Sequence, residues 1–157
     1  MYIRMVAPVK ARTGHLVIEG RKDFREFARV YPEIHRRVLE ANRPFAKEMD
    51  PILPEVLLDE NLRDLKGGRK PSGFNRQEVA GLRLVFPIRE DHKLEFYVSR
   101  SGRCSEVVSL TETLSGVLAK AGFRHQVEYD RTLTVPAHPG ISGGYRREPA
   151  ATDASGA

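Results

Sequence analysis

The sequence predicts an α+β fold in which a long, bent amphipathic helix near the N-terminus packs on a small antiparallel β-sheet. Two patterns lead to this prediction. Apolar residues recur every three or four positions between Lys22 and Met49, which is the period of a helix with one buried face. Apolar and polar residues alternate on both sides of a turn at residues 90–93, which is the period of a β-hairpin.

Length and composition favour one soluble domain. A chain of 157 residues can bury one sizeable core, and 40% hydrophobic with 30% charged residues is typical of a globular protein. No apolar run reaches the roughly 18 residues of a membrane span, and the N-terminus lacks the apolar core of a signal peptide. We therefore expect a cytoplasmic protein with no membrane partner. Residues 1–135 form the predicted domain, and the Gly-, Pro- and Ala-rich residues 136–157 form a predicted disordered tail.

The predicted N-terminal helix carries a continuous apolar stripe. Its members are Phe24, Phe27, Ala28, Tyr31, Ile34, Val38, Ala41, Phe45 and Met49. Asp23 and Glu26 have the spacing of a capping box at its start. Pro32 and Pro44 each remove a backbone donor, so we expect either a bent helix or two nearly collinear segments, the second with Pro32 in its first turn.

The other predicted elements are shorter. A strand at 15–19 precedes the long helix, a second helix spans 54–66, and residues 67–77 form a loop. The predicted hairpin pairs residues 82–89 with residues 94–99. In its first strand the residues that face the core are Leu82, Leu84, Phe86 and Ile88. Pro87 places the first of these strands at an edge, or bulges it. A loop at 100–103, a third helix at 109–121, and one or two strands within 127–135 complete the chain.

Cations gather opposite the apolar stripe and in the loop at 67–77. They are Lys22, Arg25, Arg29, Arg36, Arg43 and Lys47 on the predicted helix, and Arg69, Lys70 and Arg76 in the loop. Such cations most often form the face of a helix that points into water, because a helix with one buried side also needs a polar side. With a formal net charge of +5, the same set is also a candidate contact for phosphates or for an acidic partner. The loop is interpreted as mobile surface or as a segment that becomes ordered on a partner.

Nothing in the sequence has the spacing of a catalytic or metal-binding motif. Cys104 is the only cysteine, which excludes an internal disulfide, and we interpret it as a half-buried loop residue. The five histidines never occur at HxxH or HExxH spacing, so we expect each to be solvated or singly hydrogen-bonded. No nucleophile motif and no dinucleotide fingerprint is present. We predict a protein without catalytic activity, metal or cofactor.

One segment resembles a known family. Residues 15–55, HLVIEGRKDFREFARVYPEIHRRVLEANRPFAKEMDPILPE, resemble the opening of the bacteriophage head-tail joining or tail-completion proteins, also called minor tail components. The points of likeness are the short strand and glycine at 16–20 and the piece Ala41-Asn-Arg-Pro-Phe-Ala46. Residues 70–76 are a loose counterpart of the motif that follows in that family, and its later motifs are missing.

The resemblance implies a structural virion protein that assembles into a homo-oligomeric ring at the head-tail junction. Its partners would be other virion proteins and, by non-specific contact, DNA, and it would be assembled in the host cytoplasm into the virion. The alternative from another class is a cytoplasmic nucleic-acid-binding accessory protein that uses the basic helix face.

Overall fold

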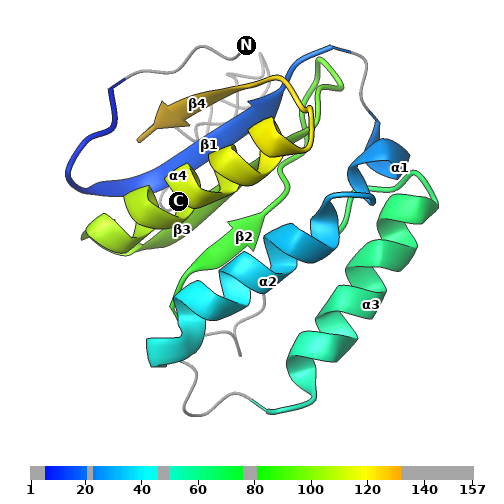
Figure 1. Ribbon diagram of the computed structural model, residues 1–157, viewed down its shortest axis with the longest axis horizontal. Coiled ribbons are helices and arrows are strands. Elements are labelled where there is room, and N and C mark those ends of the chain that lie inside the picture. The colour runs from blue at the N-terminus through cyan, green and yellow to red at the C-terminus, as the bar shows by residue number, and fades with distance from the viewer. Residues whose placement is uncertain (1–5, 21–22, 46–49, 76–80, 132–157) are drawn as a thin grey trace, which may run out of the picture.

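The structure is a computed structural model that describes residues 6–20, 23–45, 50–75 and 81–131 (Figure 1). In chain order its elements are β1 (Ala11–Ile18), α1 (Phe24–Phe27), α2 (Tyr31–Asn42), a 3-10 turn η1 (Arg43–Phe45), α3 (Leu53–Lys66), β2 (Arg83–Val85), β3 (Glu95–Cys104), α4 (Ser105–Lys120) and β4 (His125–Tyr129). This confirms the predicted α+β class. The predicted boundary at 135–136 and the strand expected at 133–135 lie outside the described residues.

The four strands form one sheet in the order β2-β3-β1-β4, and every neighbouring pair is antiparallel. Two β-α-β halves interlock here, because β3 lies between β1 and β2 while β1 lies between β3 and β4. This is the β-α-β-β-α-β arrangement known as ferredoxin-like. The helices lie on one face of the sheet, where α4 packs against β1 and β3 and beside α2 (Figure 1).

The long N-terminal helix predicted for residues 22–49 is wrong. The structure has a four-residue α1, a turn at 28–30, and a twelve-residue α2 that begins at Tyr31. Pro32 explains the break: it has no N–H for a helical bond and occupies the first turn of α2, as the sequence predicts for a second segment. The predicted cap is confirmed, since the Asp23 side chain accepts from the Glu26 N–H at 2.9 Å.

The middle of the apolar stripe is buried although the helix is broken, whereas Phe24, Ala28, Ala41 and Phe45 are half-buried and Met49 lies outside the described residues. Phe27, Tyr31, Ile34 and Val38 are all fully buried. The Phe27 ring lies at the centre of an aromatic cluster, with ring centroids 5.8 Å from Phe86, 5.4 Å from Phe96 and 6.1 Å from Phe123. Burial of aromatic surface of this size dominates the stability of a small core.

The second helix is confirmed, and the hairpin is confirmed in its pairing but not in the length of its first strand. α3 covers the predicted residues 54–66, with Pro54 in its first turn. β2 is an edge strand that pairs antiparallel with β3, with Leu84 opposite Val98. The hairpin prediction fails at Ile88, which is 86% exposed, because β2 ends at Val85 and the alternation does not continue beyond Pro87.

Two boundaries in the second half also differ from prediction. The loop expected at 100–103 belongs to β3, whose register with β1 shifts between Ser99 and Cys104. Gly102, with φ 81°, provides the backbone freedom for that irregularity. α4 starts at Ser105 rather than at 109, because Val107 and Val108 are buried and add a turn to its packed face. Cys104 therefore ends a strand rather than lying in a loop.

Two buried asparagines attach irregular backbone to the helices. The Asn61 side chain donates to the Gly73 carbonyl at 3.1 Å and accepts from the Gly73 N–H at 3.0 Å. Asn42 makes the same pair of bonds to Leu82, at 3.0 and 2.8 Å. The segment 71–75 is thus anchored, with Phe74 fully buried, which contradicts the prediction of a mobile surface loop for that part of 67–77.

Candidate functional site

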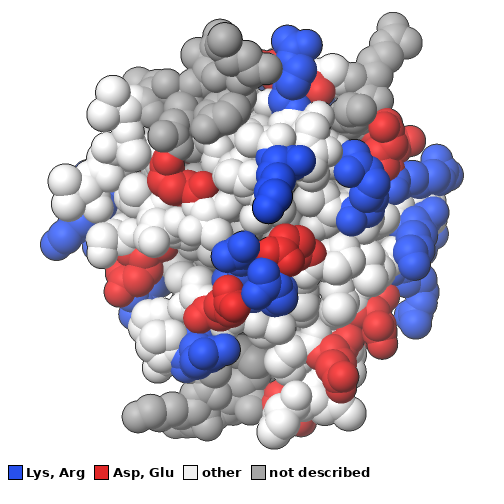
Figure 2. Space-filling model, in the orientation of Figure 1, with Lys and Arg blue, Asp and Glu red and all other residues white. Residues whose placement is uncertain are grey.

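The predicted cationic set does not form one continuous basic surface among the described residues. Arg36 bonds Glu33 at 2.6 Å and Glu40 at 3.0 Å, and Arg69 lies 3.3 Å from Asp64. Arg25 is 4.0 Å from Asp23. Figure 2 accordingly shows cationic and anionic side chains next to one another on the helix-bearing face. Arg43 and Lys70 are exposed, whereas Lys22, Lys47 and Arg76 lie outside the described residues.

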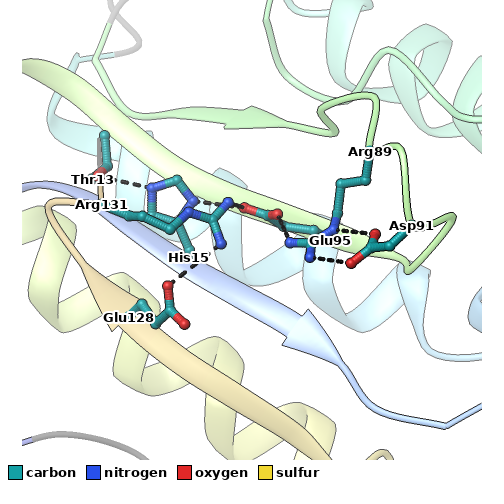
Figure 3. A network of polar contacts seen from close by, with 7 residues as sticks. All are labelled: Thr13, His15, Arg89, Asp91, Glu95, Glu128 and Arg131. Carbon is teal, nitrogen blue, oxygen red and sulfur yellow. Dashed lines mark hydrogen bonds and ion pairs between the residues drawn. The ribbon is translucent and has the colours of Figure 1, made fainter. Parts of the chain in front are cut away.

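A buried polar network lies on the other face of the sheet (Figure 3). Successive strand residues point to opposite faces, so His15 and Glu95 lie opposite the core residues Leu16 and Phe96. His15 Nδ1 is 2.7 Å from Glu95 Oε2, and His15 Nε2 is 3.0 Å from Thr13 Oγ1. Both side chains of the His15–Glu95 pair have no exposed surface.

Two arginines complete the network from outside the central strands. Arg89 donates to Glu95 Oε1 at 2.5 Å and to both oxygens of Asp91, and Arg131 donates to Glu95 and to Glu128. Burial raises the pKa of Glu95, but the hydrogen bonds from His15, Arg131 and Arg89 outweigh it and lower that pKa to about 2. Glu95 is therefore a carboxylate at neutral pH, and it joins the hairpin loop to the end of β4.

The Thr13 hydroxyl contacts the His15 imidazole, which in turn contacts the Glu95 carboxylate. A hydroxyl, a base and an acid that orients the base are therefore in line. If His15 is neutral and donates from Nδ1 to Glu95, its Nε2 accepts from the Thr13 hydroxyl. Catalytic triads use the same contacts, but they present the hydroxyl to substrate. Here His15 is fully buried and Thr13 is 8% exposed, and two arginines already neutralise Glu95. The arrangement is better suited to holding the sheet together than to catalysis.

The histidine prediction is wrong for three of the five. His15, His35 and His125 are buried, and each has two ring contacts. His35 donates from Nε2 to the Pro54 carbonyl at 2.9 Å, and burial lowers its pKa. His125 donates from Nδ1 to the Phe123 carbonyl at 2.8 Å, and its Nε2 is 2.7 Å from Ser115 Oγ. Alternation with the buried Val127 was the signal that could have placed His125 on the core face, whereas His15 lies on the opposite face of the sheet.

A groove of about 510 Å³ runs between α2 and α4. We call its small or apolar lining residues the floor and its charged lining residues the rim. The floor and wall residues are Val30, Thr113, Gly116, Val117 and Ala121, and the charged ones are Arg29, Glu33, Arg37 and Lys120. Predictions from sequence identified Arg29 but not Arg37, Lys120 or the groove itself, because the groove forms only where two helices distant in the chain come together.

The rim of the groove is net cationic. Glu33 is its only lining carboxylate, and it accepts hydrogen bonds from Arg36 and Arg37, which lower its pKa to about 2. Arg29 donates to the Ala121 carbonyl, and its guanidinium lies 4.9 Å from the Phe123 ring centroid, which holds the cation at the groove edge. Lys120 is exposed on the opposite side. An occupant with an apolar body and negative charges is complementary to this surface.

Comparison of the chain with protein-family models, with curated proteins and with solved structures finds no match. Within the described ranges no helix is long and apolar enough to cross a membrane. In the same part of the chain no group of three or more His, Cys, Asp or Glu side chains could hold a metal ion.

Proposed function

We propose that this chain is a structural protein of the bacteriophage head-tail junction that acts by assembling into a homo-oligomeric ring. The resemblance of residues 15–55 to head-tail joining proteins supports the class. The observation that carries the proposal is the groove between α2 and α4, because an apolar floor with a cationic rim is suited to receiving another surface. Assembly requires such a surface and no active site. The protein would then work in the virion, after assembly in the host cytoplasm with other virion proteins.

The nucleic-acid-binding alternative has less support. Phosphate contact needs cations that are available to the backbone, and Arg25, Arg36 and Arg69 are already in ion pairs with carboxylates. Its test is a gel-shift titration with duplex DNA at increasing salt. If this chain binds DNA through such a face, affinity falls steeply with salt and falls again on charge reversal at Arg29, Arg36 and Arg43.

The test of the proposed function is the oligomeric state of the full chain. We expect light scattering over a wide concentration range to show a closed oligomer, and electron microscopy to show rings, alone or with the purified portal protein of the phage that encodes the chain. Portal, capsid and tail-tube reading frames beside the gene would support the same class. A strict monomer at the highest attainable concentration, with no ring on the portal, would overturn the proposal.

A further inference from the structure

We propose that the occupant of the groove between α2 and α4 is the exposed face of α3 from a second copy of this chain. This inference rests on the proposed function and names the two surfaces that would form the ring contact. The groove requires a ligand that carries apolar side chains flanked by negative charge. One described element of the same chain presents that combination.

The exposed face of α3 has the required pattern. Ile52, at the start of the helix, and Val56 are 60% and 36% exposed, which makes them two of the few large apolar side chains left open to solvent in the described chain. Glu55 and Asp59 are exposed beside them, at helical spacings of three and four residues. Neither carboxylate forms an ion pair with another described residue, so both are available to a partner.

The two surfaces match in charge and in polarity. The rim of the groove offers Arg29 and Lys120, with Arg37 already paired to Glu33, whereas the first turns of α3 offer two carboxylates. The groove is open at Gly116, where a Cβ would meet no atom within 4 Å, so an aliphatic side chain can enter there. Burying Ile52 and Val56 against Val117 would remove apolar surface from water, and the charges would set the orientation.

The contact is of the head-to-tail type. The α3 face does not line the groove, so one copy can offer its α3 to a neighbour while its own groove receives the α3 of another. Heterologous contacts generate a ring when the rotation between copies closes and an open filament when it does not, whereas a self-complementary patch stops at a dimer. A contact between α3 and the groove is therefore of the type that a ring needs.

The experiment uses charge reversal on each surface and the combination of both. Asp59→Lys on α3 and Lys120→Glu on the rim should each weaken self-association of the full chain by about tenfold or more, because each places like charges opposite one another. The double variant Asp59→Lys/Lys120→Glu should recover most of the loss, since every contact again pairs opposite charges. Lys10→Glu, an exposed change just before β1 that lies neither on α3 nor among the groove residues, serves as the control and should associate as the wild type does.

A second variant fills the groove without touching a charge. Gly116→Leu should leave the thermal unfolding midpoint unchanged or higher, because the site is open and glycine is a poor helix former, yet it should abolish the oligomer. All five variants are read by light scattering and by circular dichroism, which confirms folding.

The outcomes separate this inference from the proposed function. A wild-type oligomer that Asp59→Lys, Lys120→Glu and Gly116→Leu leave intact overturns the α3 contact while the assembly role stands. A wild-type chain that is strictly monomeric overturns both. Native mass spectrometry that finds a small organic anion bound, lost in Gly116→Leu but not in Asp59→Lys, overturns the inference in favour of a small-molecule site.

Discussion

At the scale of single residues, buried polar side chains attach segments without regular secondary structure to the helices. Asn61 is the clearest example. It is fully buried, and its amide replaces a missing backbone partner for Gly73 while also donating to the Tyr31 hydroxyl at 2.9 Å. When a buried backbone group loses its hydrogen-bond partner, the loss of stability is larger than the stability that the hydrogen bond adds when it forms. The side chain of Asn61 thus holds the segment at 71–75 in place.

Asn61→Ala should therefore lower the free energy of unfolding by about 1–3 kcal/mol, since it leaves the Gly73 N–H and carbonyl buried without this partner. Urea denaturation followed by circular dichroism measures the change. The control Asn75→Ala removes an exposed asparagine near the same segment and should stay within about 0.5 kcal/mol of the wild type. Equal effects of the two substitutions would contradict the anchoring role.

Glu95 is the buried carboxylate that His15, Arg89 and Arg131 share. Glu95→Gln preserves the shape but leaves Arg89 and Arg131 facing a neutral group, so the free energy of unfolding at pH 7 should fall by about 3–5 kcal/mol. The exposed Glu90→Gln, in the same hairpin loop, is the control and should have little effect. Urea midpoints at pH 7 provide the comparison.

The pH dependence of that difference follows from the lowered pKa of Glu95. Folding lowers the pKa from an ordinary 4.5 to about 2, so the carboxylate contributes its full stability above about 4.5 and loses it as the pH falls toward 2. The stability gap between the wild type and Glu95→Gln should shrink over that window. A gap that stays constant from pH 7 down to pH 3 would show that Glu95 is not the titrating partner.

At the scale of elements, the close approach of α4 to β1 determines how the sheet is covered. Gly14 lies beneath Thr111, and a Cβ placed on Gly14 would come within 2.0 Å of Thr111 Oγ1. Thr111 Oγ1 donates to the Val107 carbonyl at 2.7 Å, so its hydroxyl is already directed into the helix. Glycine is needed here because a helix packs directly on the strand backbone.

Gly14→Ala should destabilise the fold by about 1–3 kcal/mol through overpacking. Thr111→Ala in the same chain removes the nearest clashing atoms and should recover part of the loss. Thermal unfolding of the two single variants and the double variant measures the coupling. Strict additivity of the two effects would mean that the α4–β1 contact is looser than the structure indicates.

At the scale of the whole molecule, charge distribution distinguishes assembly from nucleic-acid binding. On the face that Figure 2 shows, cationic side chains lie next to carboxylates, and Arg36 and Arg69 are in ion pairs. The groove rim is a local exception. Charge complementarity over a small surface favours contact with a specific protein, whereas binding of a polyanion needs positive potential over an extended surface.

The assembled state should consequently respond to salt in a limited way. Raising the ionic strength from 0.1 to about 1 M shortens the screening length from about 10 to 3 Å and should weaken the oligomer without abolishing it, because apolar burial remains. Sedimentation velocity at the two salt concentrations is the measurement. Complete dissociation would mean that the contact is purely electrostatic.

Local patterns in the sequence were sufficient for the α+β class, the second helix, the hairpin pairing and the buried stripe from Phe27 to Val38. Periodicity and proline chemistry act between neighbouring residues, so they can be read without coordinates. The break before α2 could also be predicted from the sequence, because Pro32 favours the start of a new helix. A single long helix was expected because the apolar stripe continues across Pro32.

Long-range packing determined the rest. His15 and Glu95 are 80 positions apart, and nothing local indicates that antiparallel register places them 2.7 Å from each other. The groove exists only because the β-α-β-β-α-β chain path brings α2 beside α4. Strand order and helix contacts depend on which surfaces of the chain pack against one another and exclude water. That is a property of the whole chain rather than of any single segment.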